Sequence, residues 1–180
     1  MKYIVFSDIH GSLYYANKMK EIIEKENIDK IILLGDLYYH GPRNPLPEEY
    51  NPIGVSQVLN SMKDKIICIR GNCDAEVDEM ISEFSFNDHV ELEIDNKKYY
   101  FTHGHHENKD NIPDGIDVLV YGHFHTGFIE EVDGVVCVNS GSITLPKNDT
   151  AHSYLIINEE GIELKNTDGN LIKKYNTQLN

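Results

Sequence analysis

Short apolar runs of strand length alternate with helical spacing in the first half of the chain. Residues 2–7 (KYIVFS) and 30–34 (KIILL) are such runs, and between them apolar side chains recur every three or four positions from Ser12 onward, at Leu13, Ala16, Met19, Ile22 and Ile23. A period near 3.6 residues is typical of an amphipathic helix, and short β-rich runs are typical of strands. The chain is therefore predicted to open with a strand, a helix and a second strand.

A second helix is predicted to begin at Asn51 and Pro52. The Asn side chain is a favourable N-cap, and proline suits the first helical position because its missing N–H is not needed there. This helix is expected to lead into a third strand at residues 65–70 (KIICIR), followed by a short helix over residues 76–84.

The second half of the chain has the pattern of β-hairpins. Asp95-Asn96 and Asp133-Gly134 separate pairs of apolar runs, and such residues favour tight hairpin turns. The runs concerned, with three later ones in the same style, are residues 90–94, 98–102, 128–132, 135–139, 153–158, 162–166 and 171–176. An alternating βαβαβ opening followed by hairpins predicts an α/β fold in which two mixed β-sheets pack face to face with helices outside, a four-layer αββα sandwich.

Composition supports one soluble domain spanning residues 1–180. The chain has 40% apolar residues, enough for one core, but no run of about 18 apolar residues that could span a membrane. No charged leader with a cleavage site precedes the first apolar run, so we expect a cytoplasmic protein. Two of the three cysteines, Cys68 and Cys137, lie inside predicted strands, where free cysteine acts as a small apolar side chain.

The net charge of -14 argues against non-specific binding to nucleic acid or to anionic membranes, both of which require clustered Lys and Arg. We therefore expect no nucleic-acid or membrane partner. A phosphate-bearing substrate would have to be attracted locally, and only two arginines, Arg43 and Arg70, are available for this.

Five apolar runs each end in side chains that can bind a metal. In order, these are Asp8-x-His10, Asp36, Asn72, His103 and His123-x-His125. In open α/β sheets, sites gather beyond the carboxyl ends of the strands, so these residues are predicted to converge. Glycine precedes Asp36, Asn72 and His123 directly, which suits close approach of the backbone to a site.

The predicted ligand set contains imidazoles, carboxylates and one amide. Seven residues are too many for a single tetrahedral zinc, so two divalent cations fit better. A pair of such ions could bind a bridging hydroxide that attacks phosphorus in line. Asp36 stands alone at the end of its strand and is the candidate bridging carboxylate.

The same residues resemble a known family. Asp8-x-His10, Gly35-Asp36, Gly71-Asn72, His103 and Gly122-His123-x-His125, in this order, are similar to the calcineurin-like metallophosphoesterases over almost the whole chain, and in detail to small bacterial phosphodiesterases of the YfcE type. The resemblance implies that Asp8, His10, Asp36 and His125 hold one metal, and that Asp36, Asn72, His103 and His123 hold the other. It makes Asp36, Asn72 and His103 the candidate catalytic residues.

Cys73 departs from the pattern of most of this family, which has histidine after the Gly-Asn pair. A thiol cannot match an imidazolium as a general acid near neutral pH, so we expect substrates whose leaving group needs little protonation. Asp74, which would normally orient the missing histidine, either keeps a role in the site or anchors the turn. A nucleophilic Cys73 is disfavoured, because it would need a nearby base or cation to form the thiolate.

The loop from Leu37 to Pro52 is long enough to suggest a function. Arg43 could contact the phosphate with its planar fork of donors, and His40 could line the rim. For Arg43, an ion pair with Glu48 or Glu49 on the surface is an equal alternative. Cys73, Arg43 and His40 are thus the candidate substrate-binding residues.

The predicted function is hydrolysis of small phosphodiesters with two divalent ions, foremost Mn²⁺, with Fe, Zn, Ni and Co as alternatives. A phosphomonoesterase or a cyclic-nucleotide phosphodiesterase is the alternative among enzymes. The expected fold also resembles that of the retromer scaffold subunit, which uses it for protein contacts. A non-catalytic protein-binding scaffold is therefore the alternative outside the enzymes. The complete ligand set argues against the scaffold, and a homodimer or higher homo-oligomer is also considered.

Overall fold

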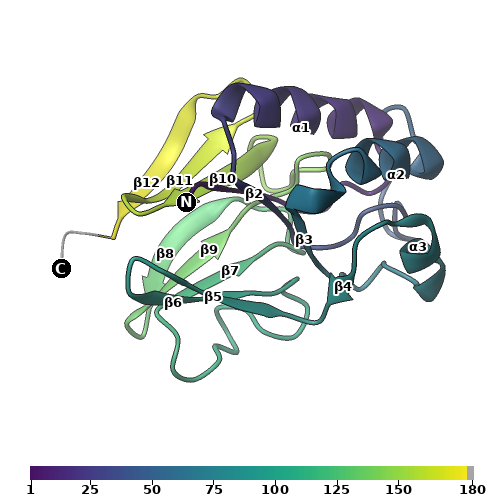
Figure 1. Cartoon of the computed structure of the whole chain (residues 1–180). Helices are drawn as coiled ribbons and strands as arrows, with labels where there is room; N and C mark the ends of the chain where they lie inside the picture. The colour runs from purple at the N-terminus through teal and green to yellow at the C-terminus, as the bar shows by residue number, and fades with distance from the viewer. Residues whose placement is uncertain (178–180) are drawn as a thin grey trace.

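Two mixed β-sheets face each other across the molecule (Figure 1). The computed structural model describes residues 1–177. The seven-stranded sheet has the order β12-β11-β10-β1-β2-β3-β4, with bounds β1 Tyr3–Phe6, β2 Lys30–Leu33, β3 Ile66–Ile69, β4 Phe86–Asn87, β10 Ser153–Asn158, β11 Gly161–Asn166 and β12 Leu171–Asn176. The five-stranded sheet has the order β5-β6-β7-β9-β8, with bounds β5 Val90–Ile94, β6 Lys97–Phe101, β7 Val118–Tyr121, β8 Phe128–Val132 and β9 Val135–Asn139.

The helices begin where the sequence predicts them. They are α1 Leu13–Glu26, α2 Pro52–Asn60 and α3 Glu76–Ile81, with a 3₁₀ turn at Lys63–Lys65. Asn51 Oδ1 accepts a hydrogen bond from the backbone N–H of Gly54, so the predicted N-cap is confirmed, and Ser12 Oγ caps the first helix by accepting one from that of Tyr15. The second helix is expected to include Met62 but ends at Asn60, and α3 is shorter than predicted because the chain becomes extended at Ser82.

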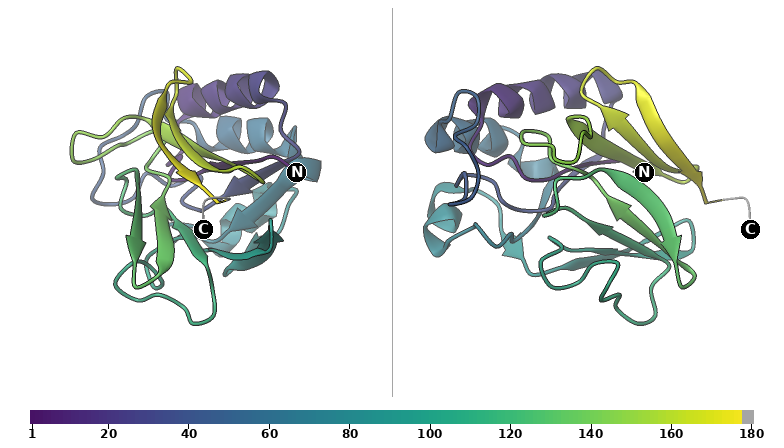
Figure 2. Two further views of the ribbon diagram at one scale, coloured as in Figure 1. Left: turned by 90° about the vertical axis from the view of Figure 1, so that its left-hand side faces the viewer. Right: turned by 180° about the vertical axis from the view of Figure 1, so that it is seen from behind.

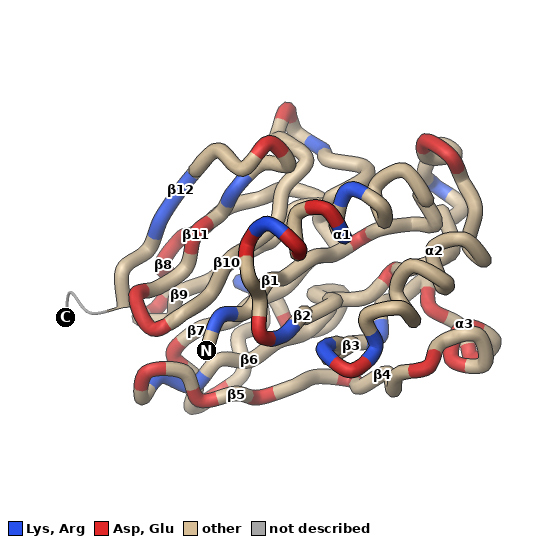
Figure 3. The backbone as a smooth tube through the Cα atoms, turned by 45° about the horizontal axis from the view of Figure 1, so that its top comes forward, with Lys and Arg blue, Asp and Glu red and all other residues tan. Residues whose placement is uncertain are grey.

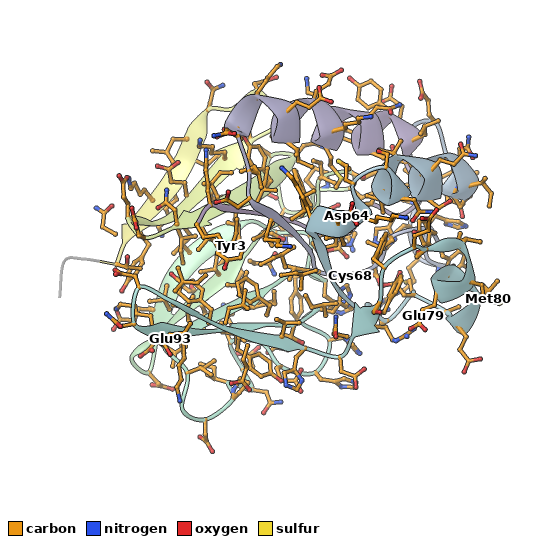
Figure 4. All side chains as sticks on the ribbon, in the orientation of Figure 1. Tyr3, Asp64, Cys68, Glu79, Met80 and Glu93 are labelled. Carbon is orange, nitrogen blue, oxygen red and sulfur yellow. The ribbon has the colours of Figure 1, made fainter. Side chains whose placement is uncertain are left out.

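The main core lies between the two sheets. It joins apolar side chains of both, including Val5, Ile32, Phe101, Val118 and Leu155. A second core lies between the seven-stranded sheet and the helices, with Met19 of α1 and Leu59 of α2 fully buried. Cys68 on β3 is part of this second core, whereas Met80 of α3 extends into solvent (Figure 4).

The outer face of the five-stranded sheet is covered in a different way. There the loop between β6 and β7 packs Ile112 and Ile116 against Tyr100, Leu119 and Tyr121. This loop lies on the side away from α1 and α2 (Figure 2). The predicted pair of sheets packed face to face is confirmed, and in the described residues the helices α1 and α2 cover one sheet while this loop covers the other.

Charged residues are spread over the surface. Figure 3 shows Asp and Glu on segments that include α1, α3 and β5, with Lys and Arg between them. Within residues 1–177, none of the helices is long and apolar enough to cross a membrane.

Glu26 joins the end of α1 to the sheet. Its carboxylate accepts hydrogen bonds from the Nζ of Lys2 at 2.7 Å and of Lys165 at 3.1 Å. Burial alone would raise the pKa of Glu26, but these hydrogen bonds and the two positive charges lower it below its usual value. The ionised carboxylate therefore stabilises the fold.

Replacing Glu26 by Gln should lower the free energy of unfolding by about 1 kcal/mol near pH 7, because the site is partly open to solvent. A lowered folded-state pKa means that the contribution is present above the unfolded value, about 4.3, and is lost as the pH falls through the folded value. Urea unfolding of the native protein and of Glu26→Gln across this pH range measures the difference in stability. Glu24→Gln, an exposed change on the same helix, is the control. A difference that persists at low pH would contradict the electrostatic explanation.

Candidate metal centre

All seven predicted ligands follow the carboxyl ends of parallel strands. In the seven-stranded sheet, β1, β2 and β3 are parallel neighbours, and in the five-stranded sheet β6 and β7 are. The residues beyond these strand ends are Asp8, His10, Asp36, Asn72, His103, His123 and His125. Because the two sheets are stacked, both sets of strand ends meet at one edge of the molecule.

The ligands form two groups that meet at Asp36. Asp8, His10 and His125 place one ligand atom each within 4.8 Å of one another, and Asp36, His103 and His123 do the same. Asp36 Oδ2 lies 3.7 Å from Nε2 of His10 and 3.4 Å from Nε2 of His103, so it faces both groups.

Asn72 completes the second group. Its Oδ1 lies 2.9 Å from Nε2 of His103, and Nδ1 of His123 lies 3.2 Å from the same nitrogen. The amide oxygen and the two imidazoles thus face a common point. Each of the two groups draws ligands from both sheets.

Hydrogen bonds to backbone carbonyls fix three of the imidazoles. Nδ1 of His10, His103 and His125 lies 2.7–2.8 Å from the carbonyl oxygens of Tyr39, Leu34 and Leu145, respectively. A carbonyl oxygen only accepts, so each Nδ1 carries the proton and donates it. In the neutral ring, the lone pair is then on Nε2, which faces the site.

These residues fit divalent cations, because their acceptor atoms face one another. Asp8 Oδ1 is buried without a hydrogen-bond partner and lies 3.2 Å from Nε2 of His125. Nε2 of His10 lies 3.2 Å from the same His125 nitrogen. Acceptors this close repel each other unless a proton or a metal cation lies between them, and mixed carboxylate and imidazole ligands suit several divalent metals.

The electrostatics of the cluster favour positive charge. Burial by itself would lower the pKa of His103, but the contact with Asp36 and the charges of Asp8 and Asp36 raise it to about 9. Despite its burial, the pKa of Asp8 lies well below the usual value because of its contacts with His10 and His125. His123 differs: burial and the neighbouring His103 lower its pKa to about 4, which keeps its ring neutral and able to bind a metal.

The backbone at the ligands is unusual. Five of the seven predicted ligands have positive φ, between 50° and 63°. They are Asp8, His10, Asp36, His123 and His125. Non-glycine residues rarely adopt this region, and such residues cluster at functional sites. Two glycines allow close approach: a Cβ on Gly71 would collide with Asp36, and one on Gly122 would collide with Ser7 and lie 2.8 Å from Asp8 Oδ2.

Cys73 lies beside the first group. It is half-buried, and Cys73, His10 and Asp36 also have ligand atoms within 4.8 Å of one another. Its backbone N–H donates to Asp36 Oδ1 at 2.8 Å and so helps to aim the other oxygen at the histidines. Burial and the charge of Asp36 raise the pKa of the Cys73 thiol to about 12, so the thiol is protonated.

Of the two other candidate substrate-binding residues, Arg43 lines the cleft beside the predicted metal centre and His40 does not. Arg43 lines a cleft of about 110 Å³ together with His10, Asp36, Asn72, Cys73 and the rest of its own turn. No ion pair joins Arg43 to Glu48 or Glu49. His40 does not line this cleft, because its ring packs against Tyr39 and Tyr50.

Other residues near the motifs have structural partners. Arg70 forms a salt bridge with Glu79 of α3, and its guanidinium carbon lies 5.3 Å from the centre of the Phe86 ring, so it is not at the cleft. His105 is exposed, its ring centre lies 5.4 Å from that of His103, and its ring packs against that of His106 at an angle of 43°. Lys147 also lines the cleft, and sequence reasoning missed it, because a single lysine in a loop carries no pattern.

Comparison with known proteins identifies the family of the chain. Residues 1–161 match the calcineurin-like phosphoesterase superfamily domain, and the chain belongs to this family. It is 37% identical to the phosphodiesterase YfcE of Escherichia coli K12 over 163 residues, which are 89% of each chain. It is 31% identical to the phosphodiesterase MJ0936 of Methanocaldococcus jannaschii over 151 residues, covering 78% of this chain and 83% of that one.

Solved structures agree with the fold. The structure of YfcE, a phosphoesterase from E. coli, matches with a TM-score of 0.94 at 34% identity, covering 98% of this chain and 99% of that one. Vacuolar protein sorting 29 from Cryptosporidium parvum matches with a TM-score of 0.65 at 16% identity, covering 98% of each chain, which shows the fold alone. The predicted family and fold are confirmed.

Asp74 holds the turns around the centre together. Its Oδ1 accepts from the backbone N–H of Leu37 at 2.8 Å, and its Oδ2 accepts from those of Asp36 at 2.8 Å and Gly71 at 2.7 Å. Asp74 therefore joins the turn after β2 to the turn after β3, which carry Asp36 and Asn72.

Replacing Asp74 by Ala should destabilise the protein by about 3 kcal/mol or more, because three backbone donors lose their acceptor. Asp74→Asn keeps one acceptor oxygen and should lose clearly less stability than Asp74→Ala. Urea unfolding of chelator-treated proteins measures this, and titration with Mn²⁺ should show weaker binding in the Ala variant. Equal stability of the Ala and Asn variants would mean that these hydrogen bonds contribute little.

Proposed function

We propose that this chain is a phosphodiesterase that hydrolyses small phosphodiesters with two divalent cations, foremost Mn²⁺, in a single domain of residues 1–180. The observation that carries the proposal is the position of Asp36, whose Oδ2 faces Nε2 of both His10 and His103. A carboxylate placed in this way suits two cations held side by side. The family and the phosphodiesterases among the relatives support the same conclusion.

In this proposal, Asp8, His10, Asp36 and His125 hold one cation, and Asp36, Asn72, His103 and His123 hold the other. When bound, two divalent cations activate water as a nucleophile and stabilise the charge on the phosphoryl oxygens. The carbonyls of Tyr39, Leu34 and Leu145 keep three of the imidazoles in the tautomer and orientation that this requires.

Arg43 and Cys73 line the cleft in which a phosphate would lie. Within residues 1–177 the Arg43 guanidinium has no acidic partner, so it can donate to a phosphate oxygen of the substrate and help to orient it. Cys73 supplies neither a thiolate nor an effective acid, because the pKa of its thiol is raised to about 12. A leaving group that departs without receiving a proton is therefore favoured, as in activated aryl diesters.

The first test measures hydrolysis of bis-p-nitrophenyl phosphate and of p-nitrophenyl phosphate, with chelator-stripped protein and Mn²⁺ added back. We expect metal-dependent activity that prefers the diester. Asn72→Ala removes a predicted ligand and should lower kcat/KM about 100-fold or more. Asn72 is exposed, so the variant is expected to fold.

Asn17→Ala, an exposed change on α1, is the matched control and should keep full activity. A preference for the monoester would replace the proposal by a phosphomonoesterase, and cyclic nucleotides, tested next, would identify a cyclic-nucleotide phosphodiesterase. Hydrolysis of none of these with any of Mn, Fe, Zn, Ni or Co would favour the non-catalytic scaffold.

A second test concerns Cys73. Replacing it by His introduces a side chain that can donate a proton, so activity on esters with poor leaving groups should rise about 10-fold or more relative to p-nitrophenyl esters. Cys73→Ser keeps the size of the side chain without this property and should leave the profile unchanged. If the His and Ser variants share one profile, the leaving-group argument is wrong.

A further inference from the structure

The cleft beside the metal centre has two cationic side chains, Arg43 and Lys147. Asp36 is the one carboxylate in its lining and faces the predicted metal ligands, so no acidic side chain of the lining is left to pair with these cations. The volume of about 110 Å³ is several times the ~10–15 Å³ that one water molecule needs. There is therefore space in the cleft for a charged group of a ligand.

Lys147 is positioned by the same loop that fixes a predicted ligand. Its backbone N–H donates to the carbonyl oxygen of His125 at 2.9 Å, and its own carbonyl accepts from the N–H of Thr150 at 3.1 Å and from Thr150 Oγ1 at 2.7 Å. The carbonyl of Leu145, two residues earlier, accepts from Nδ1 of His125. The loop thus keeps the base of Lys147 at a constant place relative to the metal centre.

In the part of the chain that the structure describes, neither Arg43 nor Lys147 has an acidic partner. The chain has 30 acidic and 16 basic residues, and seven Lys or Arg side chains make ion pairs with Asp or Glu within residues 1–177, but Arg43 and Lys147 are not among them. Their side chains also take part in no hydrogen bond of the described residues. Both charges are therefore available to a ligand, in a protein whose net charge would otherwise repel anions.

A simple phosphodiester carries a single negative charge, which would lie against the cations of the metal centre. Arg43 and Lys147 add two positive charges to those of the metal cations, which is more than the single negative charge of a simple phosphodiester requires. We propose, resting on the proposed function, that Arg43 and Lys147 together bind a second phosphate of the substrate. The substrate class is then a phosphodiester with an additional phosphate on one of its arms, which Arg43 binds through its fork of donors and Lys147 as a point charge.

Binding is measured first, because it does not require turnover. Isothermal titration calorimetry on the Mn²⁺-loaded protein compares thymidine 3′,5′-bisphosphate with thymidine 5′-monophosphate, which differ by one phosphate. The native protein should bind the bisphosphate about 10-fold more tightly, as expected for one charge-assisted contact. This advantage should shrink as ionic strength rises, because the rim is exposed to solvent.

Lys147→Met should reduce the advantage to about 3-fold or less while leaving affinity for the monophosphate nearly unchanged. Lys147→Arg should restore most of it. Lys173→Met, a change of an exposed lysine on β12, is the control and should behave as the native protein. Equal binding of the two nucleotides by the native protein overturns the proposal, as does an equal loss for both in Lys147→Met.

Hydrolysis separates this inference from the proposed function. The p-nitrophenyl ester of thymidine 5′-monophosphate is compared with the same ester carrying a 3′-phosphate, and the native protein should have the higher kcat/KM for the latter. If the simple ester is cleaved but the added phosphate changes neither binding nor rate, the inference fails and the phosphodiesterase stands. If neither ester is cleaved but the bisphosphate advantage depends on Lys147, the anion site stands and the proposed function fails.

Discussion

The hydrogen bonds from imidazole Nδ1 to backbone carbonyls are the interaction on which the centre depends. His10 and His103 donate to the carbonyls of Tyr39 and Leu34 in the segment after β2, and His125 donates to that of Leu145 after β9. These bonds decide which nitrogen carries the proton, and so which one can bind a cation. They also transfer the rigidity of the sheets to the ligands, because each carbonyl belongs to backbone that follows a buried strand or is bonded to one. The chemistry of the site is thus set by main-chain geometry as much as by side chains.

The same geometry has an energetic cost. Five of the predicted ligands have positive φ, and non-glycine residues in that region typically cost on the order of 1–3 kcal/mol each. Backbone hydrogen bonds between neighbouring turns offset the cost: the N–H of Asp8 donates to Gly35 at 3.1 Å, and that of His10 donates to Asp36 at 2.9 Å. Gly71 and Gly122 contribute by leaving out the Cβ atoms that would collide with Asp36 and Ser7.

Much of the fold and the grouping of the predicted ligands followed from local sequence patterns. The polar residues after apolar runs predicted convergence because parallel strands end at the same edge. The apolar spacing from Ser12 onward and the N-cap at Asn51 predicted the starts of the first two helices. Features set by distant contacts were not predictable in this way. The two-residue strand β4 exists through its pairing with β3, and the β6–β7 loop becomes a layer only because the outer face of a sheet needs cover. Lys147 enters the cleft through the contact of its loop with His125.

Each ligand group takes side chains from both sheets, and this has a consequence for how the molecule comes apart. Asp8 and His10 follow a strand of the seven-stranded sheet, whereas His125 follows one of the five-stranded sheet. A cation held by all three is a cross-link between two layers that are otherwise joined at that edge by apolar contacts and by hydrogen bonds such as those from Nδ1 of His103 to the Leu34 carbonyl and from the backbone N–H of His123 to Asp8 Oδ2. Metal binding and sheet separation are then linked equilibria, so the free metal concentration would set how often the layers part, and with it the exposure of the apolar core to proteases and to aggregation.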